Sequence, residues 1–172
     1  MDSQDDINYF IKELELHEDF PKKGVRFIDI MPIFKNKRCL HILIEQFKSF
    51  IPRNTNVIIA PELRGCLIAT YVSFALDLPL VVARKPKKLP GKLITAEYKT
   101  EYSVDQLQIK DGALKKDDNV FIIDDVMATG GTLRALLSII EQLESTCTGI
   151  GVITRIDKFS TDDITVPVYK MF

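Results

Sequence analysis

Two adjacent carboxylates, Asp124 and Asp125, directly follow the apolar run at residues 120–123 and precede a turn of small residues. The turn consists of Ala128, Thr129, Gly130, Gly131 and Thr132. Glycines allow the backbone to turn sharply and bring several N–H groups toward one ligand. Leucine and isoleucine then recur at helical spacing, so the turn opens a helix whose uncapped N–H groups and dipole favour a phosphate. The two threonines can add hydroxyl donors.

The two aspartates suit a different part of the same ligand. They end a buried strand, and open α/β sheets bind ligands at the carboxyl ends of their strands. Because carboxylates only accept hydrogen bonds, Asp124 and Asp125 suit the hydroxyls of a ribose or a hydrated Mg²⁺. The segment matches neither GxxxxGK[ST] nor GxGxxG, and the alternative interpretation is a tight turn with solvated aspartates. The order of carboxylates, threonines and glycines favours a sugar phosphate.

The elements that must position this segment alternate along the chain. The apolar spacing predicts helices near residues 7–14, 40–50, 65–76 and 133–144, and strands at 57–60, 80–83, 120–123 and 149–154. Strands that alternate with helices predict a parallel sheet covered on both faces. Residues 20–30 are expected to be irregular. Residues 84–111 look too polar for a core and resemble an excursion over one edge of the sheet, with a hairpin at 93–98 and 106–109.

Composition excludes several classes of function. The chain has 172 residues, 46% of them hydrophobic, which suits one domain with its own core. A net charge of −1 supplies no basic field for nucleic acid or an anionic membrane. No apolar run approaches the ~20 residues that span a bilayer, and the acidic N-terminus does not resemble a signal peptide. The three scattered cysteines indicate a reduced, cytoplasmic protein. His17 and His41 are isolated in the sequence and are expected to be structural or surface residues.

Four sequence blocks resemble, in the same order, those of the adenine phosphoribosyltransferases, a branch of the type I phosphoribosyltransferases. Residues 120–132, VFIIDDVMATGGT, resemble the phosphoribosyl-pyrophosphate motif. Residues 20–30, FPKKGVRFIDI, resemble an FPxxGxxFxDI segment, and residues 84–91, RKPKKLPG, resemble RKxxKLPG. Glu101 and Tyr102 fall where the family carries its Glu-Tyr pair. The blocks cover about three quarters of the chain, which is hard to produce by chance.

The resemblance implies an α/β fold of the type I phosphoribosyltransferase kind, with a central, mostly parallel sheet flanked by helices. It implies one domain over residues 1–172, with a small hood at 20–35 and a flexible loop at 84–111 over the active site. The implied reaction transfers phosphoribosyl from 5-phosphoribosyl 1-pyrophosphate to N9 of adenine. It further implies a homodimer and Mg²⁺ held mainly by substrate phosphates and water, with no metal site made by the protein alone.

The resemblance also assigns roles to residues that bind the donor. The loop at 128–132 would take the 5′-phosphate, and Asp124 with Asp125 would take the ribose hydroxyls. Glu62, Leu63, Arg64 and Gly65 match the family's pyrophosphate loop, although the family usually has serine where this chain has Leu63. Arg84, Lys85 and Lys88 would add positive charge around pyrophosphate, with Arg84 serving the neighbouring subunit.

The roles at the base follow from the same resemblance. Arg26, Phe27 and Ile28 would read the purine through the main chain, with the phenylalanine stacked on the ring. The family commonly has arginine where this chain has Ile28, so any contact of that arginine side chain is lost here. Glu101 would hold the proton near N7 and Tyr102 would exclude water.

Ala128 decides between purines in this scheme. Relatives that accept 6-oxopurines usually carry aspartate there, so alanine favours adenine. A phosphoribosyltransferase for another purine base and a catalytically silent nucleotide-binding regulator of the same fold are the alternatives.

Overall fold

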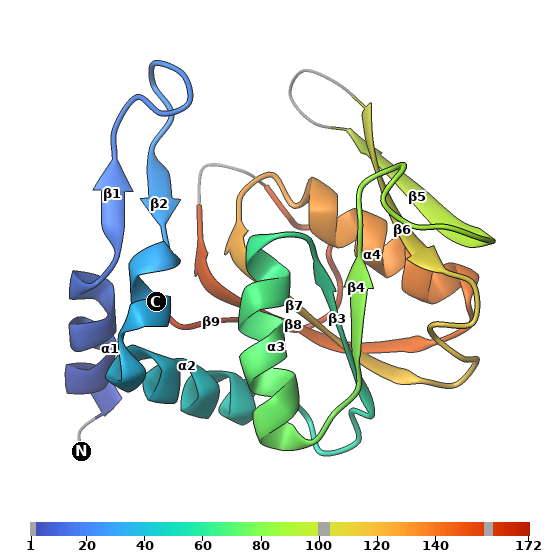
Figure 1. Cartoon of the computed structure of the whole chain (residues 1–172), viewed down its shortest axis with the longest axis horizontal. Helices are drawn as coiled ribbons and strands as arrows, with labels where there is room; N and C mark the ends of the chain where they lie inside the picture. The colour runs from blue at the N-terminus through green and yellow to red at the C-terminus, as the bar shows by residue number, and fades with distance from the viewer. Residues whose placement is uncertain (1–2, 100–103, 157–159) are drawn as a thin grey trace. The chain divides into compact units, whose positions relative to one another are not determined.

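A computed structural model of the chain describes residues 3–99, 104–156 and 160–172, and the chain divides into two compact units. The first unit is Met1–Phe47 and the second is Lys48–Phe172. Figure 1 shows the order of the elements along the chain. Residues 20–35, expected to form the hood, lie in the first unit, and the segment with the paired aspartates lies in the second.

The first unit combines helices with one short hairpin. Its elements are helix α1 (Ser3–Lys12), strands β1 (Glu15–His17) and β2 (Phe27–Asp29), the 3-10 helix η1 (Met31–Lys35) and helix α2 (Lys37–Phe50), whose last turn belongs to the second unit. The helical stripes bury Ile7, Phe10 and Phe47, as their spacing predicted. The expectation that residues 20–30 are irregular is wrong for β2, which pairs antiparallel with β1. Three-residue strands are too short to show the alternation of a strand, so only the pairing reveals them.

The second unit is built on a five-stranded sheet in the order β4-β3-β7-β8-β9. Its elements are β3 (Val57–Pro61), α3 (Arg64–Leu76), β4 (Leu80–Ala83), β5 (Leu93–Lys99), β6 (Val104–Lys110), β7 (Asn119–Met127), α4 (Gly131–Gln142), β8 (Thr146–Arg155) and β9 (Val168–Lys170). All four pairings in this sheet are parallel, which confirms the predicted parallel sheet.

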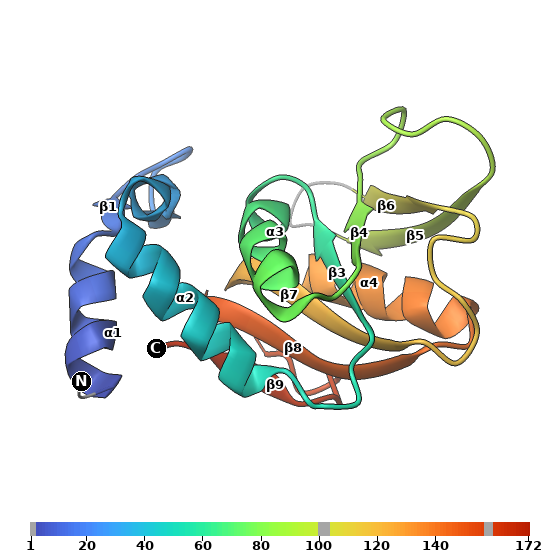
Figure 2. The same ribbon diagram turned by 60° about the horizontal axis from the view of Figure 1, so that its bottom comes forward.

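The two crossovers run in opposite directions from the boundary between β3 and β7. β3 leads through α3 to β4 on one side, and β7 leads through α4 to β8 on the other. Because such crossovers are right-handed, the two helices cover opposite faces of the sheet, as Figures 1 and 2 show. The boundary between β3 and β7 is therefore a topological switch point, where open α/β sheets bind ligands beyond the carboxyl ends of their strands.

Alternate residues of the central strands build the two faces of the core. On the α4 face the packed strand residues are Val57, Ile59, Val120, Ile122, Ile150 and Val152. The intervening Ile58 and Phe121 are also fully buried, as are Ile68 and Val72 on α3. This burial explains why β3 and β7 are continuous apolar runs.

The expectation that residues 84–111 are too polar to join the core is wrong. β5 and β6 form an antiparallel hairpin, and Leu107 and Ile109 are buried in the same cluster as α4. Arg84 and Gln108 exchange two backbone hydrogen bonds of 2.8 Å, which attach the hairpin to β4. The hairpin lies beside α4 in Figures 1 and 2. In the described ranges, no helix combines the length and apolar character needed to cross a membrane.

Candidate active site

The carboxyl ends of β3 and β7 border a cavity of about 370 Å³ at the switch point. Its lining residues are Pro61, Glu62, Leu63, Arg64, Gly65, Lys85, Tyr98, Leu107, Asp124, Asp125, Val126 and Thr132. Residues expected to bind the sugar, the pyrophosphate and the 5′-phosphate therefore meet around one cavity, although they come from segments about 60 residues apart.

The two aspartates are buried, with relative exposures of 7% for Asp124 and 5% for Asp125. Burial, followed by the charge of Asp125, raises the pKa of Asp124 well above its ordinary value. Asp124 Oδ1 accepts a hydrogen bond of 2.9 Å from the Asp125 N–H, and Asp125 Oδ2 lies 2.8 Å from Arg64 Nε. Arg64 thus compensates the charge of Asp125, while burial makes Asp124 hold a proton more readily than an ordinary aspartate, as its raised pKa shows.

Gly65 allows helix α3 to begin against the paired aspartates. A Cβ at this position would lie 2.7 Å from Asp124 Oδ1, 2.9 Å from Pro61 Cδ and 3.1 Å from the Ile123 carbonyl oxygen. Any side chain would therefore displace Asp124 or the start of the helix. The sequence placed Gly65 in the pyrophosphate loop but gave it no role.

The Glu62 carboxylate organises the loop after β3. Its Oε2 accepts a hydrogen bond of 2.8 Å from Arg84 Nε, and its Oε1 accepts one of 2.8 Å from the Lys85 N–H. Partial burial opposes ionisation, but these hydrogen bonds outweigh it and lower the pKa of Glu62. The peptide between Glu62 and Leu63 is cis, and Leu63 is exposed. Lys88 is exposed and does not line the cavity.

The turn at 128–132 has the conformation that its glycines predicted. Gly130 has φ of +77° and precedes α4, which starts at Gly131 without a side-chain cap. The Gly131 N–H donates to Thr129 Oγ1 at 3.4 Å. An uncapped helix start of this kind is suited to bind an anion.

Arg134 and Asp163, which the sequence analysis did not identify, anchor the turn at 128–132 through the Thr129 carbonyl group. Arg134 Nη1 donates to the Thr129 carbonyl oxygen at 2.6 Å. Its Nε and Nη2 donate to the two oxygens of Asp163 at 2.5 and 2.6 Å. This bidentate pair raises the pKa of Arg134 and lowers that of Asp163. The clamp fixes the carbonyl of the residue whose hydroxyl is expected to contact phosphate.

Tyr98, also missed, links the turn to the β5–β6 hairpin. Its hydroxyl lies 3.4 Å from Asp105 Oδ2 and is hydrogen-bonded to Thr132. Burial is the main cause that raises the pKa of Tyr98, so the hydroxyl keeps its proton at neutral pH. Lys85 Nζ lies 3.3 Å from the same Asp105 oxygen, which completes a polar chain from Thr132 to Lys85. No motif indicated Tyr98, because its position depends on hairpin packing.

The structure describes only some of the residues that are expected to bind the purine base. Phe27 and Ile28 lie on β2 in the first unit, where Phe27 packs edge-on against Phe20 with ring centroids 5.2 Å apart. Arg26 is exposed, with its Nε 3.2 Å from Glu18 Oε1. Glu101 and Tyr102 lie outside the described residues.

Comparison with known proteins places the chain among its relatives. Residues 32–163 match the family model described as "Phosphoribosyl transferase domain". An adenine phosphoribosyltransferase of Mycoplasma mycoides is 42% identical over 125 residues, which are 72% of this chain and 74% of the relative. One from Caldanaerobacter subterraneus is 39% identical over 153 residues, 88% and 87% of the two chains.

The chain belongs to the adenine phosphoribosyltransferase family.

Solved structures agree with this assignment. The adenine phosphoribosyltransferase of Saccharomyces cerevisiae superposes with a TM-score of 0.93 at 30% identity, covering 98% of this chain and 99% of that one. The enzyme from Thermoanaerobacter pseudethanolicus gives a TM-score of 0.91 at 31% identity, covering 96% and 98%. The expected phosphoribosyltransferase fold and family are therefore confirmed, and the cavity between β3 and β7 is the candidate active site of a phosphoribosyltransferase.

Proposed function

We propose that this chain transfers the 5-phosphoribosyl group of 5-phosphoribosyl 1-pyrophosphate to N9 of adenine, giving AMP and pyrophosphate. One observation carries the proposal: the paired aspartates, Arg64 and the Glu62 loop surround a single cavity at the switch point of the sheet. Relatives that bear the name adenine phosphoribosyltransferase support the substrate, and the yeast relative was crystallised with adenine and an iminoalditol bisphosphate.

The donor is proposed to bind by its two charged ends and its sugar. The 5′-phosphate accepts hydrogen bonds from the turn at 128–132 and the start of α4, with Thr129 and Thr132 as hydroxyl donors. The ribose hydroxyls donate to Asp124 and Asp125. Pyrophosphate leaves toward the Glu62 loop, where Arg64 and Lys85 supply positive charge. Arg84 is engaged by Glu62 and shapes this loop in its own chain.

Mg²⁺ belongs to the proposal because the residues present suit it. Asp125 Oδ2 is buried and accepts no hydrogen bond from the described residues, although Arg64 lies close to it. Such a carboxylate oxygen suits a metal-bound water, and Mg²⁺ prefers waters and substrate phosphates to an all-protein cage. When bound, Mg²⁺ neutralises charge on the leaving pyrophosphate. Chelation with EDTA is expected to abolish pyrophosphate release and added Mg²⁺ to restore it; full activity in EDTA would contradict this part.

The chemical step breaks the bond between C1′ and the pyrophosphate oxygen and forms the bond between C1′ and N9 of adenine. The transition state is expected to resemble an oxocarbenium ion. Adenine loses one ring proton as N9 bonds to C1′; Glu101 is proposed to take this proton at N7 of the purine, and Tyr102 to exclude water. The backbone of residues 26–28 is proposed to read the base.

A panel assay tests the function. Adenine, hypoxanthine, guanine and xanthine are each offered with the donor and Mg²⁺, and pyrophosphate release is measured. Adenine is expected to give the highest turnover, because Ala128 provides no carboxylate for a 6-oxopurine. Release with hypoxanthine above that with adenine would refute the argument from Ala128. No release with any base would refute catalysis and favour a nucleotide-binding regulator.

The proton role has its own test. Glu101→Gln is expected to lower kcat by about 10²–10⁴-fold, the usual contribution of general acid–base catalysis. Glu97→Gln is the matched control, because Glu97 is an exposed carboxylate on β5 that accepts a hydrogen bond from Gln106 and does not line the cavity. Equal kcat values for the two variants would remove Glu101 from the mechanism.

We also propose a homodimer in the cytoplasm. Tyr71 and Phe74 lie one turn apart on α3 and are 40% and 90% exposed, an apolar surface that suits association with a second copy. The three cysteines are free thiols, in keeping with a reducing compartment. Light scattering of the purified chain is expected to give twice the monomer mass, and Phe74→Glu is expected to shift it toward the monomer.

A further inference from the structure

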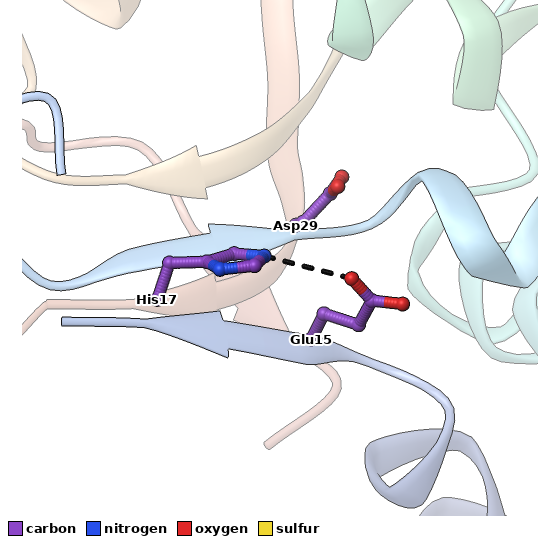
Figure 3. A group of neighbouring side chains, drawn as sticks. All are labelled: Glu15, His17 and Asp29. Atoms are coloured by element: carbon purple, nitrogen blue, oxygen red, sulfur yellow. Dashed lines mark ion pairs between the residues drawn. The ribbon is translucent and has the colours of Figure 1, made fainter.

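The hairpin of the first unit gathers three side chains with metal-binding atoms. Glu15 and His17 project from the same face of β1, and Asp29 lies directly opposite Glu15 on β2. Figure 3 shows the three side chains beside one another. One ligand atom of each lies within 4.8 Å of the others, and His17 Nε2 is 3.5 Å from Glu15 Oε2. The fold therefore brings one histidine and two carboxylates together, although His17 looked isolated in the sequence.

Two carboxylates lie opposite each other across this hairpin. Like charges directly opposite each other on paired antiparallel strands repel. In the described part of the chain, His17 is the one basic side chain in an ion pair with either carboxylate. A bound cation would compensate the two carboxylates.

The ligand set selects the kind of cation. One imidazole nitrogen with two carboxylate oxygens suits Zn²⁺, which binds such atoms at about 2.0–2.2 Å and leaves a position for water. Ligands of a tetrahedral ion then lie roughly 3.4 Å apart, close to the observed 3.5 Å between His17 and Glu15. Asp29 Oδ1 accepts a hydrogen bond of 2.8 Å from the Met31 N–H, which orients the carboxylate as outer-sphere contacts orient metal ligands.

We propose that Glu15, His17 and Asp29 form a binding site for a divalent transition-metal ion, with Zn²⁺ as the best match. Glu15 and Asp29 also line a cavity of about 820 Å³ in the first unit, which gives a hydrated ion access to the ligands. The ion bridges β1 and β2, so it fixes the strand that carries Phe27 and Ile28. Binding itself does not depend on the proposed reaction.

Calorimetric titration of the full chain with ZnCl₂, without substrates or chelators, tests the site. Wild-type protein is expected to bind one Zn²⁺ at this site and to show a higher Tm in its presence. Glu15→Gln, His17→Ala and Asp29→Asn are each expected to weaken binding at least ~10-fold, the smallest loss usual even for outer-sphere changes. Asp29→Asn retains an acceptor for the Met31 N–H, so the turn after β2 is preserved.

Two control variants make the result decisive. His41→Ala removes the other histidine, which is exposed on α2, and Glu18→Gln removes a carboxylate next to the hairpin ligands. Both are expected to keep wild-type Zn²⁺ affinity. Absence of binding by the wild type, or wild-type affinity in His17→Ala, would overturn the proposal. Equal losses in His17→Ala and His41→Ala would overturn it as well. Because no substrate is present, the outcome is independent of the panel assay.

Discussion

Replacement of Gly65 by alanine tests how the active site is assembled. The added Cβ would lie 2.7 Å from Asp124 Oδ1, 2.9 Å from Pro61 Cδ and 3.1 Å from the Ile123 carbonyl oxygen. None of these atoms is the end of a long, flexible side chain, so the clash is relieved only by moving Asp124 or the first turn of α3. Either movement separates the paired aspartates from the pyrophosphate loop.

The size of the effect follows from these contacts. Overpacking a tight site by one methyl group costs about 1–3 kcal/mol. For a domain of this length, each kcal/mol shifts Tm by about 2–4 °C, so a decrease of roughly 2–12 °C is expected. Displacement of Asp124 also removes a hydrogen bond from the ribose to a carboxylate, worth about 1.5–3 kcal/mol, or roughly 10- to 100-fold in donor affinity.

Thermal unfolding and calorimetric titration with 5-phosphoribosyl 1-pyrophosphate measure the two effects. Gly112→Ala is the control, because Gly112 has φ of +79°, open space around its Cα and no place in the cavity. It is expected to lower Tm through backbone strain while donor affinity stays unchanged. If Gly65→Ala bound the donor as tightly as the wild type, the steric argument would be wrong. Equal losses of donor affinity in both variants would attribute the effect to general destabilisation.

Three further substitutions test the remaining parts of the site. Asp124→Asn is expected to weaken donor binding by about tenfold or more and to raise the Tm of the free protein at pH 7. Because the pKa of Asp124 is raised in the folded protein, wild-type stability falls as pH rises from the unfolded-state pKa through the folded-state pKa. The difference in Tm between Asp124→Asn and the wild type should therefore vanish near pH 3, where the wild-type carboxyl is protonated in both states. A difference that stayed constant with pH would refute the raised pKa of Asp124. Arg134→Leu is expected to raise the donor KM about fivefold with little change in stability, because the Asp163 pair is exposed to solvent. Lys116→Leu, at another exposed ion pair, should leave KM unchanged. Tyr98→Phe is expected to raise the donor KM about two- to tenfold by removing the hydroxyl link to Thr132, and an unchanged KM would exclude that link from donor binding.

The sequence predicted those parts of the fold that are determined by residues close together in the chain. β3, α3 and α4 were located within a few residues because apolar spacing reports burial along a continuous segment. β7 was also located, but it runs on to Met127, so Asp124 and Asp125 lie within the strand and not after it. β1, β2 and β9 were missed because each has three residues, too few to show a strand pattern, and is defined by its pairing with another strand. The sequence located the hairpin of β5 and β6 but did not predict that it is buried, because Leu107 and Ile109 are buried by packing against α4.

The sequence by itself determined the segment that is expected to hold the sugar phosphate. A strand end, two carboxylates and a glycine turn into a helix lie within 13 consecutive residues, 120–132, so local geometry suffices to bring them together. Tertiary structure alone decided that Gly65 abuts Asp124, that Arg134 joins Asp163 to the turn, and that Tyr98 reaches Thr132. It also placed His17 beside Asp29. These contacts depend on crossover direction and strand register, and neither is encoded in the spacing of the residues concerned.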